Sequence, residues 1–171
     1  SGSAIQMGVS FRETPQNAAR GIGVPGGRDV QYVCDHCTFH ANGEAGSAVV
    51  HVEGNGHALD FSSSIVSGSA GSAFACVSGG ALSISCSDAW GNAEGDWTDC
   101  AAGQLGVSGN FSADPLFCGE AGGAGGEYAL QVGSPCAPAG NPCGELIGAF
   151  GVGCDVTAIR ASSFGAVKSL Y

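Results

Sequence analysis

The chain has 171 residues, 44% of them hydrophobic and 31 of them glycine, and its formal net charge is -10. This length and apolar content suit one domain with a core, and the glycines follow no three-residue period, which excludes a collagen-like chain. Fifteen acidic residues against five basic ones repel nucleic-acid phosphates and anionic lipids, so we expect no nucleic-acid partner. No run approaches the ~18 apolar residues of a membrane-spanning helix, so we expect no membrane span.

Residues 1–29 predict a strand followed by a loop. Small or polar residues alternate with four apolar ones, as in a half-buried β-strand: Ile5, Met7, Val9 and Phe11. Residues 13–29 hold two prolines and several glycines without a sustained period, which predicts a loop. Because the strand has no hairpin partner next to it in the sequence, we expect it to add to another subunit.

The stretch from residue 57 to residue 93 repeats one short pattern. Each half holds an alternating apolar strand, a serine-containing corner and a shorter apolar strand, with a period of roughly 23 residues. A third copy precedes them, formed by the strand-like residues 30–34 and by residues 37–42. This periodicity, without a helical pattern, predicts a β-solenoid over residues 30–108, and the scarcity of leucine disfavours a leucine-rich repeat. Glycine-containing pairs suited to sharp corners mark the predicted turns, at 42–43, 55–56, 79–80 and 91–92.

Stacked coils place equivalent side chains one above the other. We therefore expect Phe39, Val66 and Ala89 to form one internal column, and residues 42, 69 and 92 to form a column at a turn. After Asn92 the period is lost, and we expect polar loops. The side chains predicted to point into the core are Phe39, Leu59, Phe61, Ile65, Val66, Leu82 and Ile84.

Two runs near the end carry a family resemblance: GNFSADPLFC at residues 109–118 and YALQVGSPCAPAGNPCGELIGAFGVGC at residues 128–154. Together with the coils from Val30 onward, they resemble the closing part of bacterial secreted right-handed parallel β-helix repeat proteins. The resemblance implies an all-β fold, a short right-handed parallel β-helix (β-solenoid) with a disulfide-rich, loop-rich C-terminal segment at residues 109–154. It also implies a secreted or surface-exposed chain, although that family usually has more coils than the three or four visible here. It says little about function, because this scaffold has many uses.

Nine cysteines spread along the chain predict disulfides and therefore an oxidising, extracellular location. Seven of them fall between Cys76 and Cys154, where we expect at least three disulfides. The odd number leaves one cysteine unpaired, and the sequence alone does not fix the pairing. The candidates are Cys34, Cys37, Cys76, Cys86, Cys100, Cys118, Cys136, Cys143 and Cys154.

Two groups of residues suggest metal sites, and for each a simpler explanation is favoured. Cys34 and Cys37 form a CxxC pair with histidines nearby, but the second ligand pair of a structural zinc site is missing and residues three apart fall on opposite faces of a coil. We therefore favour disulfides or a stacked cysteine ladder. A cluster of carboxylates could supply oxygen ligands for calcium, but no calcium-loop motif is present, so we favour a solvated loop. The cluster comprises Asp88, Glu94, Asp96 and Asp99, with Asp114 in a later loop. We expect no bound metal or cofactor.

Polysaccharide cleavage is the remaining enzymatic possibility. It needs carboxylates that project together from one face, and Asp35, Asp60 and Asp88 recur near equivalent coil positions. Their spacing is loose and no lysine or arginine lies between Arg28 and Arg160, so we expect no catalytic activity. Trp90 and Trp97 flank a turn and would suit stacking on a sugar, but shielding of an open coil end is the favoured role.

Uncovered coil ends favour self-assembly as the function. Monomeric solenoids cover their ends with capping units, and none is recognisable before the strand at residues 5–11. We expect a structural, self-assembling extracellular protein whose copies stack head to tail into a filament or surface layer. One alternative is a carbohydrate-binding or polysaccharide-cleaving β-helix module with cell-surface glycans as partners; another is a piece of a longer β-helix whose further coils supply the cap. The predicted assembly interface combines the N-terminal strand with one face of the tail at residues 155–171: Ile5, Met7, Val9, Phe11, Phe164, Val167, Leu170 and Tyr171.

Overall fold

A computed structural model describes residues 30–119 and 127–154. These residues form eight β-strands and one short 3-10 helix, which agrees with the predicted all-β class. The elements are β1 (Val30–Asp35), β2 (Thr38–His40), β3 (Ala48–Glu53), β4 (His57–Ser62), β5 (Ile65–Ser67), β6 (Ser72–Val77), β7 (Ala81–Ser85), β8 (Asp88–Trp90) and η1 (Asp99–Ala101). In this part of the chain, no helix is long and apolar enough to cross a membrane. The eight predicted assembly residues lie outside the described residues.

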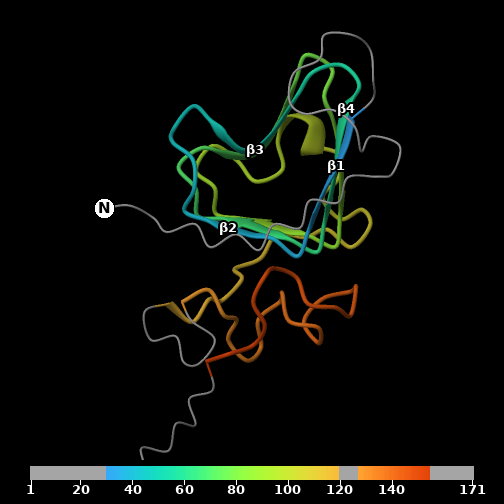
Figure 1. Cartoon of the computed structure of the whole chain (residues 1–171). Helices are drawn as coiled ribbons and strands as arrows, with labels where there is room; N and C mark the ends of the chain where they lie inside the picture. Colours follow the sequence, from blue (N-terminus) through green and yellow to red (C-terminus); the bar gives the residue numbers. More distant parts are fainter. Residues whose placement is uncertain (1–29, 120–126, 155–171) are drawn as a thin grey trace, which may run out of the picture.

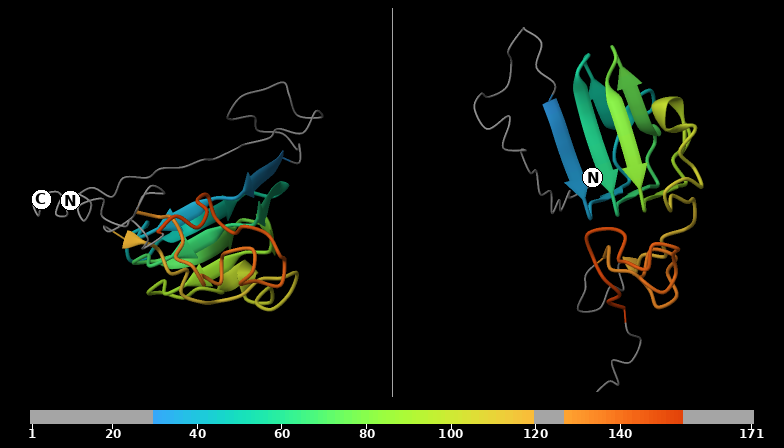
Figure 2. Two further views of the ribbon diagram at one scale, coloured as in Figure 1. Left: turned by 90° about the horizontal axis from the view of Figure 1, so that it is seen from below. Right: turned by 90° about the vertical axis from the view of Figure 1, so that its right-hand side faces the viewer.

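The strands form three parallel sheets that the chain visits in a fixed order. Their strand orders are β1-β4-β7, β2-β5-β8 and β3-β6, and all pairings between these strands are parallel. Figure 1 shows the sheets on three sides of one interior, and Figure 2 shows the strands of the first sheet side by side. Phe39 pairs with Val66 and Val66 with Ala89, as the predicted internal column requires.

Aromatic side chains from different sheets meet in the interior. Phe61 of β4 lies 6.2 Å from Phe39 of β2 and 5.6 Å from Phe74 of β6, measured between ring centroids. Trp97 packs on Phe74 at 5.6 Å from the side of the last loop. Because Phe61 and Phe74 are each only 1% exposed, they join the three sheets into one core.

The corners between the first two sheets have a shared backbone conformation. His36, Ser63 and Cys86 adopt positive φ values of 53°, 46° and 46°, so a single left-handed residue turns the chain between consecutive strands. The residues that directly follow these three are connected from one circuit to the next by a ladder of hydrogen bonds. The Cys37 N–H donates to the Ser64 hydroxyl, the Ser64 N–H to the Ser87 hydroxyl, and the Ser87 N–H to Oδ1 of Asn110.

Three features differ from the sequence prediction. The first two circuits each contain a third strand, β3 and β6, which the two-strand repeat did not include. The first two circuits are offset by 27 residues and the next two by 23, since the corner between β2 and β3 is longer than that between β5 and β6. Ile65 does not point into the shared core, because it is adjacent to the inward Val66; it is buried on the other face of its sheet.

After Asn92 the strands of the repeat end, as predicted. The chain nevertheless continues to stack on the preceding circuit, which was not predicted. Residues 93–111 continue for part of another circuit, and their polar side chains seal the edges of β6 and β7. Oδ2 of Asp99 accepts the Cys76 N–H, while Gln104 accepts from the Ile84 N–H and donates to the Leu82 carbonyl. Asn110 donates to the carbonyls of Ile84 and Gln104.

Residues 109–119 and 127–154 cover the outer face of the sheet β2-β5-β8, and we call them the covering segment (Figures 1 and 2). The first residues of these strands, Thr38, Ile65 and Asp88, are in register and all contact it. The Thr38 hydroxyl accepts the Ala149 N–H at 2.9 Å, and Ile65 packs with Leu130, Cys136 and Ile147 in a second apolar cluster. The chain therefore has two cores, one on each face of this sheet.

Candidate functional site

Eight of the nine cysteines form disulfides, and Cys136 is free and buried. Three of the four bonds fall in the region predicted to hold at least three: Cys76–Cys100, Cys86–Cys143 and Cys118–Cys154. Cys34 and Cys37 bond to each other, a pairing that the sequence did not fix, and their sulfurs therefore form a disulfide rather than a pair of zinc ligands. These bonds indicate an oxidising environment such as the extracellular space.

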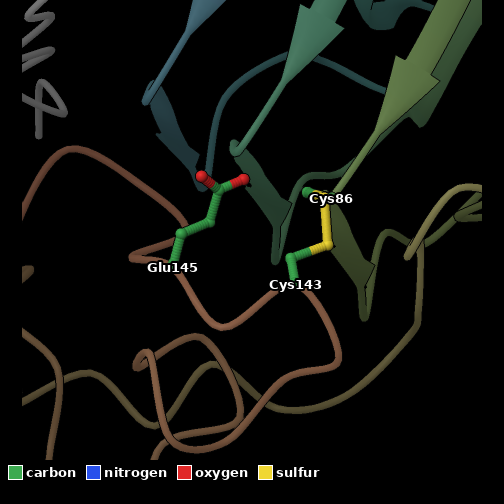
Figure 3. A group of neighbouring side chains, drawn as sticks. All are labelled: Cys86, Cys143 and Glu145. Carbon is green, nitrogen blue, oxygen red and sulfur yellow. A yellow bond between two sulfur atoms is a disulfide. The ribbon is translucent and has the colours of Figure 1, made fainter.

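The Cys86–Cys143 bond joins the corner after β7 to the covering segment, and Glu145 lies beside it (Figure 3). Potential ligand atoms of the three side chains lie within 4.8 Å of one another. The two sulfurs are bonded to each other, however, and do not act as thiolate ligands. The Glu145 carboxylate instead accepts a hydrogen bond from Ser63 at 2.9 Å, so the cluster fastens the segment to two stacked corners.

The carboxylates considered for calcium are used by backbone donors rather than gathered around a shared point. Asp96 accepts the N–H groups of Gly91 and Asn92, Asp99 accepts that of Cys76, and Glu94 accepts that of Gly46. Each carboxylate closes a different turn or edge. Asp88 of the same predicted cluster is not in a solvated loop, because it is fully buried.

The three carboxylates considered for polysaccharide cleavage are not brought together. Asp35 and Asp60 lie on the outer face of the first sheet, where Asp35 accepts from Ser62 and Asp60 from Gln31. Asp88 belongs to another sheet and is fully buried beneath the covering segment. The pair of nearby carboxyl groups that glycoside hydrolysis requires is therefore not formed by these residues.

The two tryptophans have different surroundings. Trp97 packs against the core at the sealed end, which is the shielding role favoured from the sequence. Trp90 is 42% exposed at the end of β8. Trp97 is half-buried against Phe74, so its ring is less available for stacking than that of Trp90.

The two ends of the sheets differ. One end is sealed by residues 93–111, as described above. At the other end, the edges of β1, β2 and β3 pair with no further strand among the residues that the structure describes, and we call them the first-turn edge. The interior is less covered there, since Phe39 is half-buried whereas Val66 and Ala89 in the same column are fully buried.

A groove of about 350 Å³ opens at the first-turn edge, between β1 and the end of β3. Its walls combine apolar and ionisable side chains, namely Tyr32, His51, Val52, Glu53, His57 and Leu59. Tyr32 is 42% exposed and lies edge-on to His57, with ring centroids 6.3 Å apart. Such a groove offers apolar walls together with the carboxylate of Glu53.

An aromatic cluster lies against β2, whose edge belongs to the same end. His40 of β2 lies 5.1 Å from Phe117 and 5.8 Å from Tyr128, and Tyr128 lies 6.5 Å from Phe150. The Nδ1 atom of His40 is 3.0 Å from the Ser67 hydroxyl. Burial lowers the pKa of His40 below its usual value, and Glu127 and Asp114 only partly oppose this shift.

Charge is divided between the ends and the middle of the sequence. All five basic residues are terminal: Arg12, Arg20, Arg28, Arg160 and Lys168. Positions 30–154 contain no lysine or arginine and carry twelve of the fifteen acidic residues. The sheet-forming part is therefore an acidic body, and the residues proposed for assembly lie in the segments that hold the cations.

Sequence reasoning did not find the groove, because its walls come from three strands with no shared motif. The lining residues come together only because Tyr32 of β1 pairs with Leu59 of β4 and because β3, which the sequence did not predict, supplies the other wall. No family model matches this chain, and neither a curated protein nor a solved structure does.

Proposed function

We propose that this chain is a secreted structural protein whose short right-handed parallel β-helix body joins head to tail with copies of itself. The observation that carries the proposal is the difference between the sealed end and the first-turn edge. A body capped at both ends has no edge for a neighbour, and a body open at both ends would stack in either direction. A body with one sealed end and one open edge supports growth of a polymer at the open edge only.

The occupant that we assign to the first-turn edge is residues 5–11 of a second copy. Addition of a strand to β1 satisfies its unpaired backbone groups, and alternate side chains of the added strand face the interior. Ile5, Met7, Val9 and Phe11 have this alternation, and the strand length matches the six residues of β1. The exposed Tyr32 and half-buried Leu59 are the inward residues on which they would pack.

Charge complementarity supports the same partner. Arg12 directly follows the predicted strand, and the groove carries Glu53 within an acidic body. Attraction between the basic N-terminal segment and that body steers the two copies together despite their like net charge. Because the donor and the acceptor are different surfaces, the contact is heterologous and propagates as a filament.

The test compares the full chain with a variant that lacks residues 1–12. We expect the full chain to sediment as polymers and to show filaments in negative-stain images, and the shortened chain to remain monomeric. Val9→Asp places a charge on the apolar face and should also prevent assembly, whereas the matched control Ser10→Asp on the opposite face should not. A full chain that is monomeric at high concentration, or a shortened chain that forms filaments of the same repeat, would overturn the proposal.

Glycan binding is a second candidate, favoured by an exposed aromatic side chain beside a carboxylate in the groove. Tyr32 offers a ring for stacking and Glu53 offers hydrogen-bond acceptors for sugar hydroxyls. The shortened chain separates the two candidates, since glycan binding does not need residues 1–12. Affinity electrophoresis in soluble polysaccharides should show retardation that Tyr32→Ala removes; no retardation of the shortened chain in neutral or acidic polysaccharides would exclude this candidate.

A further inference from the structure

Asp88 is a buried carboxyl group at the contact between a sheet and the segment that covers it. It is the first residue of β8, it is 0% exposed, and its side chain faces the covering segment. Its Oδ1 atom accepts the Ala113 N–H at 3.0 Å, and its Oδ2 atom lies 3.5 Å from Sγ of Cys136. One carboxyl group thus touches the segment at two places that are far apart in the sequence, Ala113 and Cys136.

The surroundings of Asp88 disfavour its ionised form. Burial raises its pKa to about 7, and the nearby carboxylates Asp96 and Asp114 act in the same direction. The Ala113 N–H and the Cys136 thiol favour the ionised form but do not compensate. The titratable groups that act on Asp88 are therefore two acids and a thiol, and positions 30–154 provide no lysine or arginine to pair with it.

Cys136 is unable to take over the charge. Its side chain is fully buried, and burial together with Asp88 raises the pKa of its thiol, so the sulfur keeps its proton. Ser134 fixes the loop around it, because the Ser134 hydroxyl accepts the Cys136 N–H and donates to the Pro115 carbonyl. The proton of Asp88 is thus the one that changes near neutral pH.

Among the described residues, the covering segment has two other titratable contacts. His40 packs on Phe117 and Tyr128, and its pKa is lowered by burial, so it gains its charge only at a lower pH than an exposed histidine. The Glu145 carboxylate accepts the hydrogen bond from Ser63.

The remaining contacts of the segment do not titrate. The Cys86–Cys143 disulfide fixes one side, and the Thr38 hydroxyl and Ile65 contact the other. Charging Asp88 therefore does not release the segment but weakens it locally, around Ala113 and Cys136.

We propose that Asp88 is a pH-dependent latch, which holds the covering segment closed on β8 around Ala113 and Cys136 when it is protonated and loosens it there when it is ionised, giving solvent access to Cys136. This device does not depend on the proposed assembly, because none of its residues belongs to the first-turn edge. A neutral or alkaline surrounding would loosen the contact around Ala113 and Cys136, and a mildly acidic one would tighten it.

The test measures how well the fold protects Cys136 from 4,4′-dithiodipyridine. The protection factor is the labelling rate of the urea-unfolded chain divided by that of the native chain at the same pH, which cancels the titration of the thiol itself. For the wild type we expect the factor to fall at least about tenfold between about pH 5.5 and about pH 8.5. Asp88→Asn should remove the fall, and the matched control Asp60→Asn on the outer face of the first sheet should leave it unchanged.

A wild-type protection factor that is equal at both pH values would overturn the latch, and so would an Asp88→Asn variant that keeps the full fall. If the Asp88→Asn variant does not fold, the protection factors of the wild type at the two pH values still test the proposal. In ¹³C-labelled wild-type protein, NMR should show one aspartate carboxyl carbon that titrates near pH 7. If every carboxyl group titrates below about pH 5, Asp88 is charged at neutral pH and the proposal fails.

Discussion

The backbone N–H of Ser64 donates a hydrogen bond to the side-chain hydroxyl of Ser87, at a distance of 3.2 Å and 23 residues further along the chain. Both residues are fully buried at a corner. The contact repeats in the circuits before and after it, through Cys37 and Asn110. Polar side chains in the interior thereby fix the register between circuits, which apolar packing alone specifies weakly.

Removal of one ladder hydroxyl should cost measurable stability. Ser87→Ala leaves the buried Ser64 N–H without its acceptor, and we expect a loss of about 1–3 kcal/mol in the free energy of unfolding. Urea denaturation followed by circular dichroism measures it. Ser83→Ala, on the exposed outer face of β7, is the control, and an equal loss in both variants would contradict the ladder.

The two cores should respond separately to truncation. Phe61→Ala removes the side chain that joins the three sheets, and Ile65→Ala removes one that contacts the covering segment; each should lower the free energy of unfolding by about 2–5 kcal/mol. Only Ile65→Ala should raise the labelling of Cys136, since both belong to the second cluster. Val132→Ala is the control because Val132 is 73% exposed. If both core variants unfold at the same urea concentration as the wild type, the packing of these two side chains is wrong.

The disulfide pattern predicts a definite count of reactive thiols. Alkylation of urea-unfolded protein without reductant should add one group, at Cys136, and alkylation after reduction should add nine. Each of the three longer bridges should contribute about 2–4 kcal/mol, so reduction should strongly destabilise the fold. Intact mass spectrometry provides the count. More than one adduct before reduction would mean that a bridge is absent.

Global stability should depend on pH through Asp88. Its pKa is raised in the folded state relative to 3.8, so between about pH 4 and pH 7 the folded chain binds more protons than the unfolded chain. The free energy of unfolding therefore falls as pH rises through this range, by up to about 4 kcal/mol. His40 acts in the opposite direction because its folded pKa is lowered. The difference between wild type and Asp88→Asn isolates the carboxyl group, and parallel pH curves would contradict this prediction.

Assembly should weaken as salt is added. If basic N-terminal segments dock on acidic bodies, then screening lowers the attraction, although the strand pairing itself is insensitive to salt. Sedimentation of the full chain at about 50 mM and about 500 mM NaCl should show more polymer at the lower concentration. Arg12→Gln should reduce this dependence and Arg28→Gln, further from the predicted strand, should affect it less. More polymer at high salt would instead indicate a contact between like charges.

The sequence predicted the elements whose pattern lies in neighbouring residues. It did not predict the features that depend on contacts between residues far apart in the chain. Alternation and glycine pairs located β1, β4 and β7 and the turn glycines, since these depend on neighbouring residues. The strands β3 and β6 were missed because their apolar residues are mixed with alanine, serine and histidine. The burial of Asp88 was not foreseeable, because it requires a segment more than twenty residues away to fold over the sheet. Nothing in the sequence paired the cysteines of the three longer disulfides either, since these bonds join parts of the chain that are far apart in the sequence.

Asn110 has a consequence for how the protein is produced. It begins the tripeptide Asn110-Phe111-Ser112, which is an acceptor for N-linked glycosylation. Both hydrogens of its side-chain nitrogen are already used, by the carbonyls of Ile84 and Gln104, and the residue is 3% exposed. A sugar on that nitrogen would remove one of these bonds and leave no room for the sealed end to close. A host whose secretory pathway modifies chains during translocation should therefore yield two populations, an unmodified folded form and a glycosylated form without its cap, whereas bacterial export should yield the first alone.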